Sequence, residues 1–228
     1  MKRVLRLLTI FIFLFSLAQT EVYAQKKSRK MIKADNAFDL EQYVKAAELY
    51  KKVYKKTKNR ALKSEIIFKQ AECYRLSGNN KRAESYYKRA IKAKYPDVIV
   101  YLHYAEVLRM QGDYEEATLQ YLEYLRFQGV EESVAKDLIK HDKRVKDYIP
   151  GEMGLKSCEF ALKWKDAPTR YKVELMLFVN SKYSDYSPAF GNGEYTEMYF
   201  TSSRAGGLTD DIDQRTGEAF SDIYVTKL

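Results

Sequence analysis

The sequence predicts an α+β protein with two modules, an N-terminal α-solenoid followed by a smaller unit of β-strands. Helical segments recur at intervals of 34 residues between Ala71 and Tyr121, and such recurrence is typical of solenoids. Short apolar strands separated by Gly-containing turns fill residues 171–228. Of the 228 residues, 46% are hydrophobic and 31% are charged, a globular composition that excludes a wholly disordered chain.

The N-terminus has the organisation of a secretory signal peptide, residues 1–24. A basic stretch at residues 1–6 precedes an apolar run at residues 7–18, and Val22 and Ala24 suit cleavage by signal peptidase. The run is shorter than the roughly 20 apolar residues that span a bilayer, although an uncleaved anchor is the alternative interpretation. The chain is therefore expected to work outside the cytoplasm.

Charge is distributed unevenly along the chain, whose formal net charge is +9. Residues 25–60 hold 12 Lys and Arg against 4 Asp and Glu, whereas residues 181–228 hold 4 against 8. The basic block could face an anionic lipid or an acidic partner, and a solvated helix face is the simpler interpretation. The export signal argues against nucleic acid as a partner.

Small and aromatic residues recur 34 positions apart in the first module. Gly78 and Gly112 are predicted to lie in turns, because Gly accepts a backbone that a side chain would strain. The spacing within each unit is helical, which predicts a helix, a turn and a second helix. The recurring pairs are Ala71 and Ala105, Ala83 and Ala117, and Tyr87 and Tyr121. A weaker copy, in which Glu41 replaces the turn Gly, contains Ala34, Phe38, Tyr43, Ala46, Tyr50 and Val53.

This pattern resembles the tetratricopeptide repeat over residues 28–128. Three repeats are about the minimum for a stable stack, and a helical stretch at 131–148 is predicted to cap it, so the solenoid is assigned to residues 25–150. The resemblance implies protein binding in a concave groove lined by the first helix of each repeat. The groove residues that it implies are Phe68, Glu72, Arg75, Leu76, Leu102, Glu106, Arg109 and Met110.

Two of the groove positions repeat a charge pattern, as Glu72/Arg75 and Glu106/Arg109. Pairs three residues apart can brace their own helix, for a few tenths of a kcal/mol each. The alternative is a strip of mixed charge that recognises a protein partner. The bracing interpretation is favoured, with partner binding assigned to the apolar groove positions.

The second half of the chain is predicted to contain a helix followed by short strands. Residues 151–170 are predicted to form a linker helix. Strands are predicted at 171–179, 198–204 and 222–226. The first of these runs is nearly continuously apolar, which favours a strand with little solvent on either face.

Three short motifs in residues 181–228 resemble the TolB-type, WD-like β-propeller repeat: Ser-Asp-x-Ser-Pro-x-Phe, Tyr-Phe-Thr-Ser-Ser-Arg and Asp-Ile-Tyr. Only one such block is present, and a propeller closes with about four to eight blades. Residues 171–228 are therefore expected to be the first blade of an incomplete β-propeller, and the chain is expected to be the N-terminal fragment of a longer protein.

The order of these modules resembles a group of envelope proteins of Bacteroidetes-type bacteria, some of them in type IX secretion and gliding machinery. The resemblance implies protein partners in the periplasm at the outer membrane, and an OmpA-like, peptidoglycan-binding domain after Leu228. The predicted function is a non-catalytic protein–protein interaction scaffold in outer-envelope assembly or secretion. The alternatives are the N-terminal part of a propeller-gated peptidase or hydrolase, and an envelope protein that binds peptidoglycan or carbohydrate.

Catalytic and metal-binding patterns are not readable in the sequence. His103 and His141 lie far apart in helical contexts, and no Ser/His/Asp arrangement accompanies them. Cys73 and Cys158 are expected to be free, buried thiols, although the exported compartment would allow a disulfide. The acidic turn at 210–213 lacks the rest of a calcium loop. No enzyme, metal or cofactor is predicted.

Overall fold

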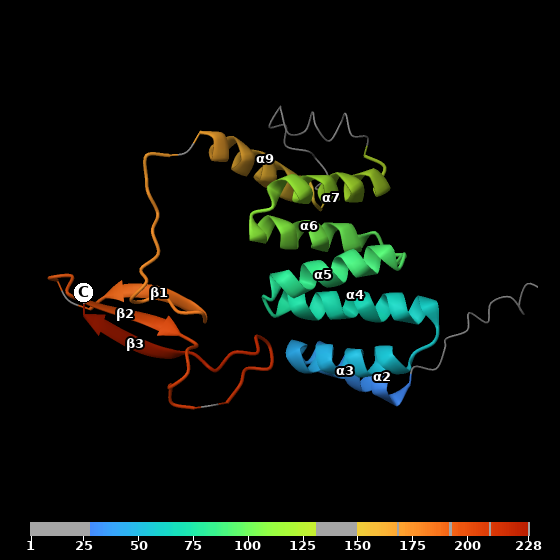
Figure 1. Cartoon of the computed structure of the whole chain (residues 1–228), viewed down its shortest axis with the longest axis horizontal. Coiled ribbons are helices and arrows are strands. Elements are labelled where there is room, and N and C mark those ends of the chain that lie inside the picture. Colours follow the sequence, from blue (N-terminus) through green and yellow to red (C-terminus); the bar gives the residue numbers. More distant parts are fainter. Residues whose placement is uncertain (1–27, 131–149, 168, 192, 210, 228) are drawn as a thin grey trace, which may run out of the picture.

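A computed structural model describes most of the chain after the signal-like segment. Seven helices and three strands lie within the described residues (Figure 1). The predicted signal peptide and the predicted capping helix at 131–148 fall outside them. The described residues are 28–130, 150–167, 169–191, 193–209 and 211–227.

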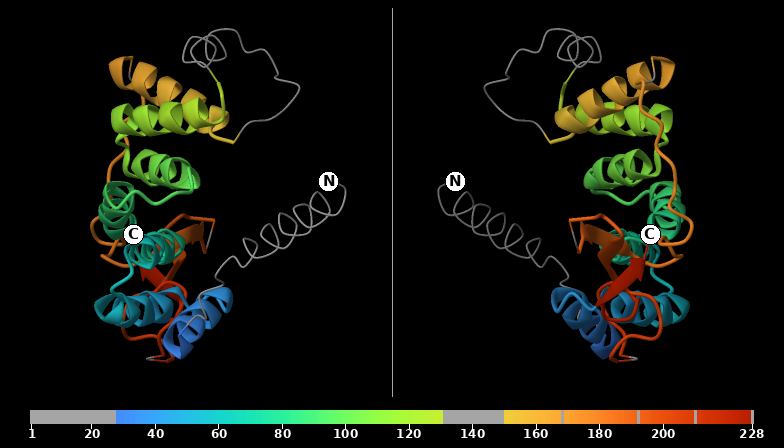
Figure 2. Two further views of the ribbon diagram at one scale, coloured as in Figure 1. Left: turned by 90° about the vertical axis from the view of Figure 1, so that its right-hand side faces the viewer. Right: turned by 90° about the vertical axis from the view of Figure 1, so that its left-hand side faces the viewer.

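Six of the helices form three pairs that stack in chain order (Figures 1 and 2). Each pair also packs on the next, because α3 contacts α4 and α5 contacts α6. None of the described helices is long and apolar enough to cross a membrane. The pairs are α2 (Arg29–Asp39) with α3 (Tyr43–Lys56), α4 (Arg60–Leu76) with α5 (Asn80–Lys92), and α6 (Ile99–Gln111) with α7 (Tyr114–Phe127).

The turn inside each pair requires left-handed backbone. Gly78 and Gly112 have φ of 77° and 82°, as predicted for turn glycines. Glu41, which replaces Gly in the first pair, takes the same conformation with φ of 56°. The weaker first copy is thus a helix pair of the same kind. At four helix starts a side chain accepts a hydrogen bond from the backbone N–H three residues ahead. These side chains belong to Ser28, Asn59, Asn79 and Asp113.

The recurring small residues are buried between the packed helices. Ala71, Ala83, Ala105 and Ala117 are each fully buried. A methyl side chain lets two helix backbones approach closely, and the large residue beside it fills the remaining space. That large residue is a fully buried Tyr in each pair, namely Tyr50, Tyr87 and Tyr121. The residues that recur 34 positions apart thus lie in the core of the stack.

A seventh helix, α9 (Glu152–Asp166), covers the far end of the stack. It packs on α7 and also contacts α6, the place that the first helix of a fourth pair would take (Figure 1). Leu155 and Cys158 are buried in the same core cluster as Tyr121. The helix lies inside the predicted linker at 151–170, and its buried face closes the core.

The C-terminal module contains a three-stranded antiparallel sheet in the order β1-β2-β3. Its strands are β1 (Asp185–Phe190), β2 (Glu197–Ser202) and β3 (Asp222–Lys227). Met198 and Phe200 of β2 form a small core with Val179, and Tyr224 packs against it. Pro188 sits in β1, an edge strand with an irregular register between Tyr186 and Ala189. Edges and bulges are the places where a sheet tolerates Pro.

The strand predicted at 171–179 is not formed. Residues 171–176 have no regular secondary structure, and residues 177–179 form a turn. Val173 is 95% exposed and Leu177 is 81% exposed. An apolar run becomes a strand only beside a partner that takes its backbone hydrogen bonds, and no described strand pairs with this segment.

A loop between β2 and β3 ties the sheet module to the first helix pair. The backbone N–H of Val44 donates to the carbonyl of Gln214 over 3.1 Å. Arg215 forms a salt bridge with Glu41, and Gly217 lies against the Val44 side chain. These contacts hold the loop against the start of α3 (Figure 1).

A candidate protein-binding face on α4 and α6

The eight predicted groove residues lie on α4 and α6. These helices meet where Glu72 contacts His103 and where Arg75 contacts Glu106. Met110 is 63% exposed, whereas Leu102 is only 7% exposed. Glu72 is also 7% exposed. Neither buried residue offers enough surface to contact a partner directly, so the sequence-based assignment of these two is corrected to a supporting role. The half-buried members are Phe68, Arg75, Leu76, Glu106 and Arg109.

Glu72 is the centre of a buried polar network. Its carboxylate accepts hydrogen bonds from the Tyr87 hydroxyl and from Arg75, the latter over 2.7 Å. The Nδ1 atom of His103, on α6, lies 2.8 Å from the same carboxylate. Arg75 also donates to the Tyr87 hydroxyl over 3.2 Å and lies 3.8 Å from Glu106. The network therefore joins α4, α5 and α6.

These contacts keep the Glu72 carboxylate ionised. Burial opposes the negative charge, but hydrogen bonds from His103 and Arg75 and their electrostatic attraction outweigh burial and lower the pKa of Glu72 to about 2. Burial and the Glu72 charge raise the pKa of the Tyr87 hydroxyl far above its usual range. Tyr87 is therefore a neutral donor at physiological pH.

The first pair repeats the arrangement with other residues. Asp35 on α2 accepts a hydrogen bond from the Tyr50 hydroxyl over 2.7 Å and pairs with Lys69 of α4 over 2.6 Å. Lys69 stands 34 residues before His103. Asp35 and Glu72 are thus each bound by the Tyr of their own helix pair and by a basic residue on the first helix of the next pair.

The predicted i,i+3 pairs differ between the two repeats. Arg75 and Glu72 form the predicted pair, with 2.7 Å between Arg75 Nη2 and Glu72 Oε2. In the next repeat Glu106 lies 3.8 Å from Arg75 of the preceding repeat, and Arg109 donates to the Tyr121 hydroxyl over 3.4 Å. The network links repeats, whereas pairs within one helix would have braced each repeat separately.

Aromatic rings extend this face towards the turn after α5. Phe68 stacks on Tyr95, with 4.3 Å between ring centroids and 9° between planes. The His103 ring is nearly parallel to Phe68, 6.4 Å away. His103 is thereby a packed helix residue, and it also contributes to the Glu72 network.

The two thiols are buried away from this face, and the described acidic residues form no metal site. Cys73 and Cys158 are free and buried, in two different core clusters. Burial and the nearby Glu72 charge raise the pKa of the Cys73 thiol to about 12. Within the described residues, no group of three or more His, Cys, Asp or Glu could hold a metal ion.

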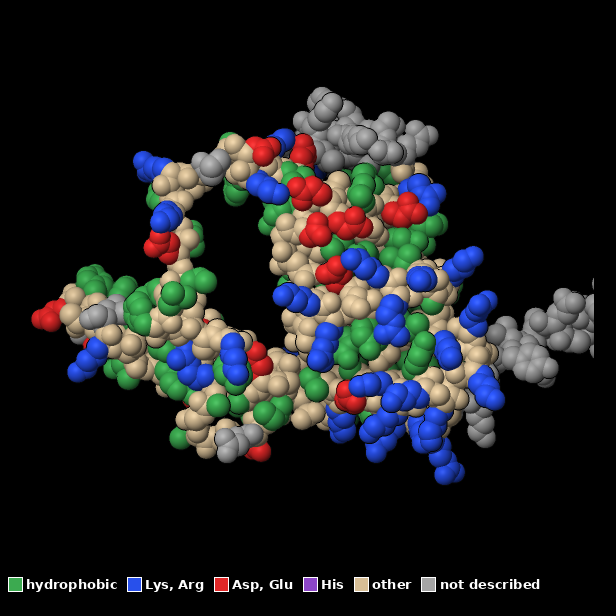
Figure 3. Space-filling view, in the orientation of Figure 1, with side chains coloured by type: hydrophobic (Ala, Val, Ile, Leu, Met, Phe, Trp, Pro, Cys, Tyr) green, Lys and Arg blue, Asp and Glu red, His purple; other side chains and the backbone are tan. Residues whose placement is uncertain are grey.

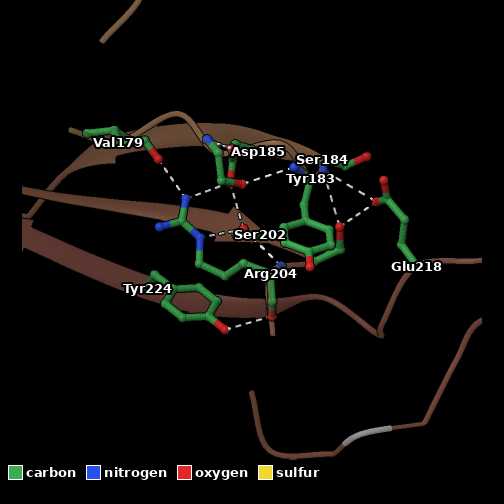
Figure 4. Close-up of polar contacts among 10 residues, drawn as sticks. Val179, Tyr183, Ser184, Asp185, Ser202, Arg204, Glu218 and Tyr224 are labelled. Atoms are coloured by element: carbon green, nitrogen blue, oxygen red, sulfur yellow. Dashed lines mark hydrogen bonds and ion pairs between the residues drawn. The ribbon is translucent and has the colours of Figure 1, made fainter. Parts of the chain in front are cut away.

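The motifs of the sheet module form a second polar cluster (Figure 4). Arg204 donates to the Val179 carbonyl over 2.6 Å and to Asp185 over 2.7 Å. Its guanidinium lies over the rings of Phe200 and Tyr224, 4.8 and 5.2 Å from their centroids. Although burial opposes it, bonds from Ser202 and Arg204 hold the pKa of Asp185 well below its usual range. The cluster joins β1 and β2 to the segment before them.

The comparison with protein families agrees with the helix pairing. Residues 33–97 and residues 68–129 each match the family model of the tetratricopeptide repeat. The helical stack is a tetratricopeptide-repeat region. No curated protein matches the chain. Tetratricopeptide repeats indicate a protein–protein interaction scaffold, and they are typically not catalytic.

Sequence reasoning missed part of this face. It gave Tyr87 and Tyr121 only as recurring residues of the repeat, and it did not include Lys69. The 34-residue interval between Lys69 and His103 could have indicated this role. A basic residue that recurs at the repeat interval can pair with an acidic residue of the preceding repeat.

Proposed function

We propose that the protein is a non-catalytic scaffold of the bacterial cell envelope, which binds protein partners on the α4–α6 face during outer-envelope assembly or secretion. The main support is the Glu72 network, which fixes three helices and so holds the half-buried Phe68 and the exposed Met110 in a rigid arrangement. A face that needs no reordering loses little conformational entropy on binding.

The sheet module is proposed as the first blade of a β-propeller and as a second protein-binding surface. Its three motifs support this assignment, as does the cluster around Arg204, which uses motif residues from two strands. The described sheet has three strands, one fewer than a typical blade. The unpaired apolar segment at 171–176 is available to other strands of such a propeller.

The envelope location rests on the signal-like organisation of residues 1–24. We expect the chain recovered from the periplasm to begin at Gln25, because cleavage after Ala24 follows the small-residue pattern of signal peptidase. Mass spectrometry of the N-terminal peptide measures this directly. An intact Met1 or a lipidated terminus in that fraction would remove the export assignment.

Partner contact is expected at Met110 and not at Leu119. Both side chains are well exposed, at 63% and 58%, but Met110 lies on α6 whereas Leu119 lies on α7. A photo-crosslinking amino acid placed at position 110 should trap a protein partner in envelope extracts, and the same group at position 119 should not. Equal crosslinking at both positions would contradict the assigned face.

The matched substitutions are Met110→Glu and Leu119→Glu. We expect Met110→Glu to weaken capture of the trapped partner at least tenfold, since a charge would replace an apolar contact. Leu119→Glu should bind as the unchanged protein does. Circular dichroism melts of both variants should stay within a few degrees of the original, since neither side chain is buried.

A further inference from the structure

An open cleft of about 1100 Å³ lies at the edge of the stack where α3 and α5 end and α4 begins. Four basic side chains line it, and two aromatic rings contribute to its wall. We call it the basic cleft. The residues that define it here are Arg60, Lys63, Lys92, Lys94, Tyr54 and Tyr95.

The four cations of the basic cleft have no acidic partner among the residues that the structure describes. Within the described residues, none of them forms a salt bridge, although other cations of the stack do, such as Lys88 with Glu84. Glu65 also lines the cleft, but it lies 3.8 Å from Lys69. Lys and Arg side chains gather over this part of the molecule, whereas acidic side chains lie mainly in the upper half of the same view (Figure 3).

Further positive charge lies on the same edge. Lys56, at the end of α3, is close enough to Lys30 for their contact and repulsion to lower the pKa of Lys30. Lys63 Nζ lies 5.2 Å from the centroid of the Tyr54 ring. The cleft therefore combines several positive charges with an aromatic and apolar wall.

Lys94 occupies a backbone conformation that favours glycine. Its φ is 55°, and it follows the residue that caps the end of α5. At the corresponding place after α7 stands Gly129, with φ of 80°. A lysine held in left-handed backbone at the rim of a cleft is a local strain, and such strain persists more often at functional positions than elsewhere.

We propose that the basic cleft binds the phosphate groups of an anionic lipid surface. Three of its four cations are Lys, which acts on phosphate as a point charge and needs no fixed orientation of the phosphate group. Tyr rings and long Lys stems suit the boundary between headgroups and acyl chains. Tyr95 borders both this surface and the α4–α6 face, through its stacking on Phe68, whereas the four cations of the basic cleft are not among the residues of that face.

The test compares binding of the full chain to two kinds of vesicle. Phosphatidylcholine vesicles report binding by the apolar segment at 7–18, which all variants share, and vesicles that also contain phosphatidylglycerol report the basic cleft. Lys63→Gln with Lys94→Gly should weaken the phosphatidylglycerol-dependent binding roughly 25-fold, at about fivefold for each lysine. Because Lys94→Gly relieves the left-handed strain, the same variant should melt no lower than the original chain.

The control is Lys45→Gln with Lys81→Gln, which makes the same change in net charge at the starts of α3 and α5, on the opposite edge. We expect this control to bind phosphatidylglycerol vesicles nearly as well as the original chain. Equal loss in both double variants would overturn the proposal, because net charge alone would then explain binding. Binding of inorganic pyrophosphate in the cleft without vesicle binding would also overturn the assignment to a lipid surface.

Discussion

Replacing Glu72 by alanine is expected to destabilise the repeat region by about 3–5 kcal/mol, the range measured when one partner of a buried ion pair is removed. The substitution leaves the Arg75 guanidinium, which is only partly exposed, without its 2.7 Å partner. It also removes the acceptor of the Tyr87 hydroxyl and the neighbour of His103. Urea denaturation followed by circular dichroism measures the loss.

Glu106→Ala is the matched control. Glu106 also pairs with Arg75, over 3.8 Å, but its side chain is 38% exposed. An exposed pair of this kind contributes about 1 kcal/mol at most. Equal costs for Glu72→Ala and Glu106→Ala would show that burial of the Glu72 network contributes nothing to stability.

The same carboxylate predicts how stability depends on pH. The pKa of Glu72 falls from 4.5 to about 2 on folding, so the folded protein holds the ionised form more strongly than the unfolded chain does. The stabilisation is complete above about pH 4.5 and is lost as the pH falls towards 2. It amounts to about 3 kcal/mol. In Glu72→Gln, the acid loss measured by denaturation between these pH values should shrink by a similar amount.

The repeats can be predicted from the sequence because the residues that their packing requires recur several times along the chain. Each pair needs a small residue at the helix crossing and left-handed backbone at the turn, and Ala71 and Gly78 recur 34 residues later as Ala105 and Gly112. Even Glu41, which breaks the Gly pattern, adopts the expected turn.

The sheet was harder to predict because strand formation depends on distant partners. The apolar run at 171–179 has the composition of a strand but no neighbour among the described strands. The segment 185–190 contains Pro188 and was not assigned to a strand, yet it pairs with β2 as an edge strand. By composition, residues 171–179 are the better candidate for a strand and residues 185–190 the poorer one. The hydrogen bonding shows the reverse.

For the face on α4 and α6 too, one part could be predicted from the sequence and another part could not. Its positions followed from the repeat, but the exposure of each side chain did not. Leu102 and Met110 both read as apolar groove residues, whereas the structure leaves 7% of the first and 63% of the second exposed. The difference arises because Leu102 packs in the core cluster that also contains Leu155 of α9, and a helix so far along the chain is not visible in the repeat pattern.

The docking of α9 leads to the second large prediction, for Gly154→Leu. By helix propensity alone this substitution inside a helix would stabilise the protein by nearly 1 kcal/mol. The structure predicts the opposite sign, because a Cβ atom at position 154 would overlap the ring of Tyr121. Tyr121 is 1% exposed and its hydroxyl accepts a hydrogen bond from Arg109, so the ring has little freedom to move.

We expect Gly154→Leu to cost about 3 kcal/mol or more, from overpacking and from partial exposure of Leu155 as α9 moves away from α7. Cys158 supplies a local readout, since it is buried beside Leu155 while Cys73 lies in the other core cluster. In the variant a thiol reagent should label Cys158 and leave Cys73 unmodified, as peptide mapping can show. Gly193→Leu is the control, because a Cβ there meets no atom within 4 Å. If Cys158 stays unlabelled in Gly154→Leu and the melt is unchanged, then α9 does not close the stack through the contact with Tyr121.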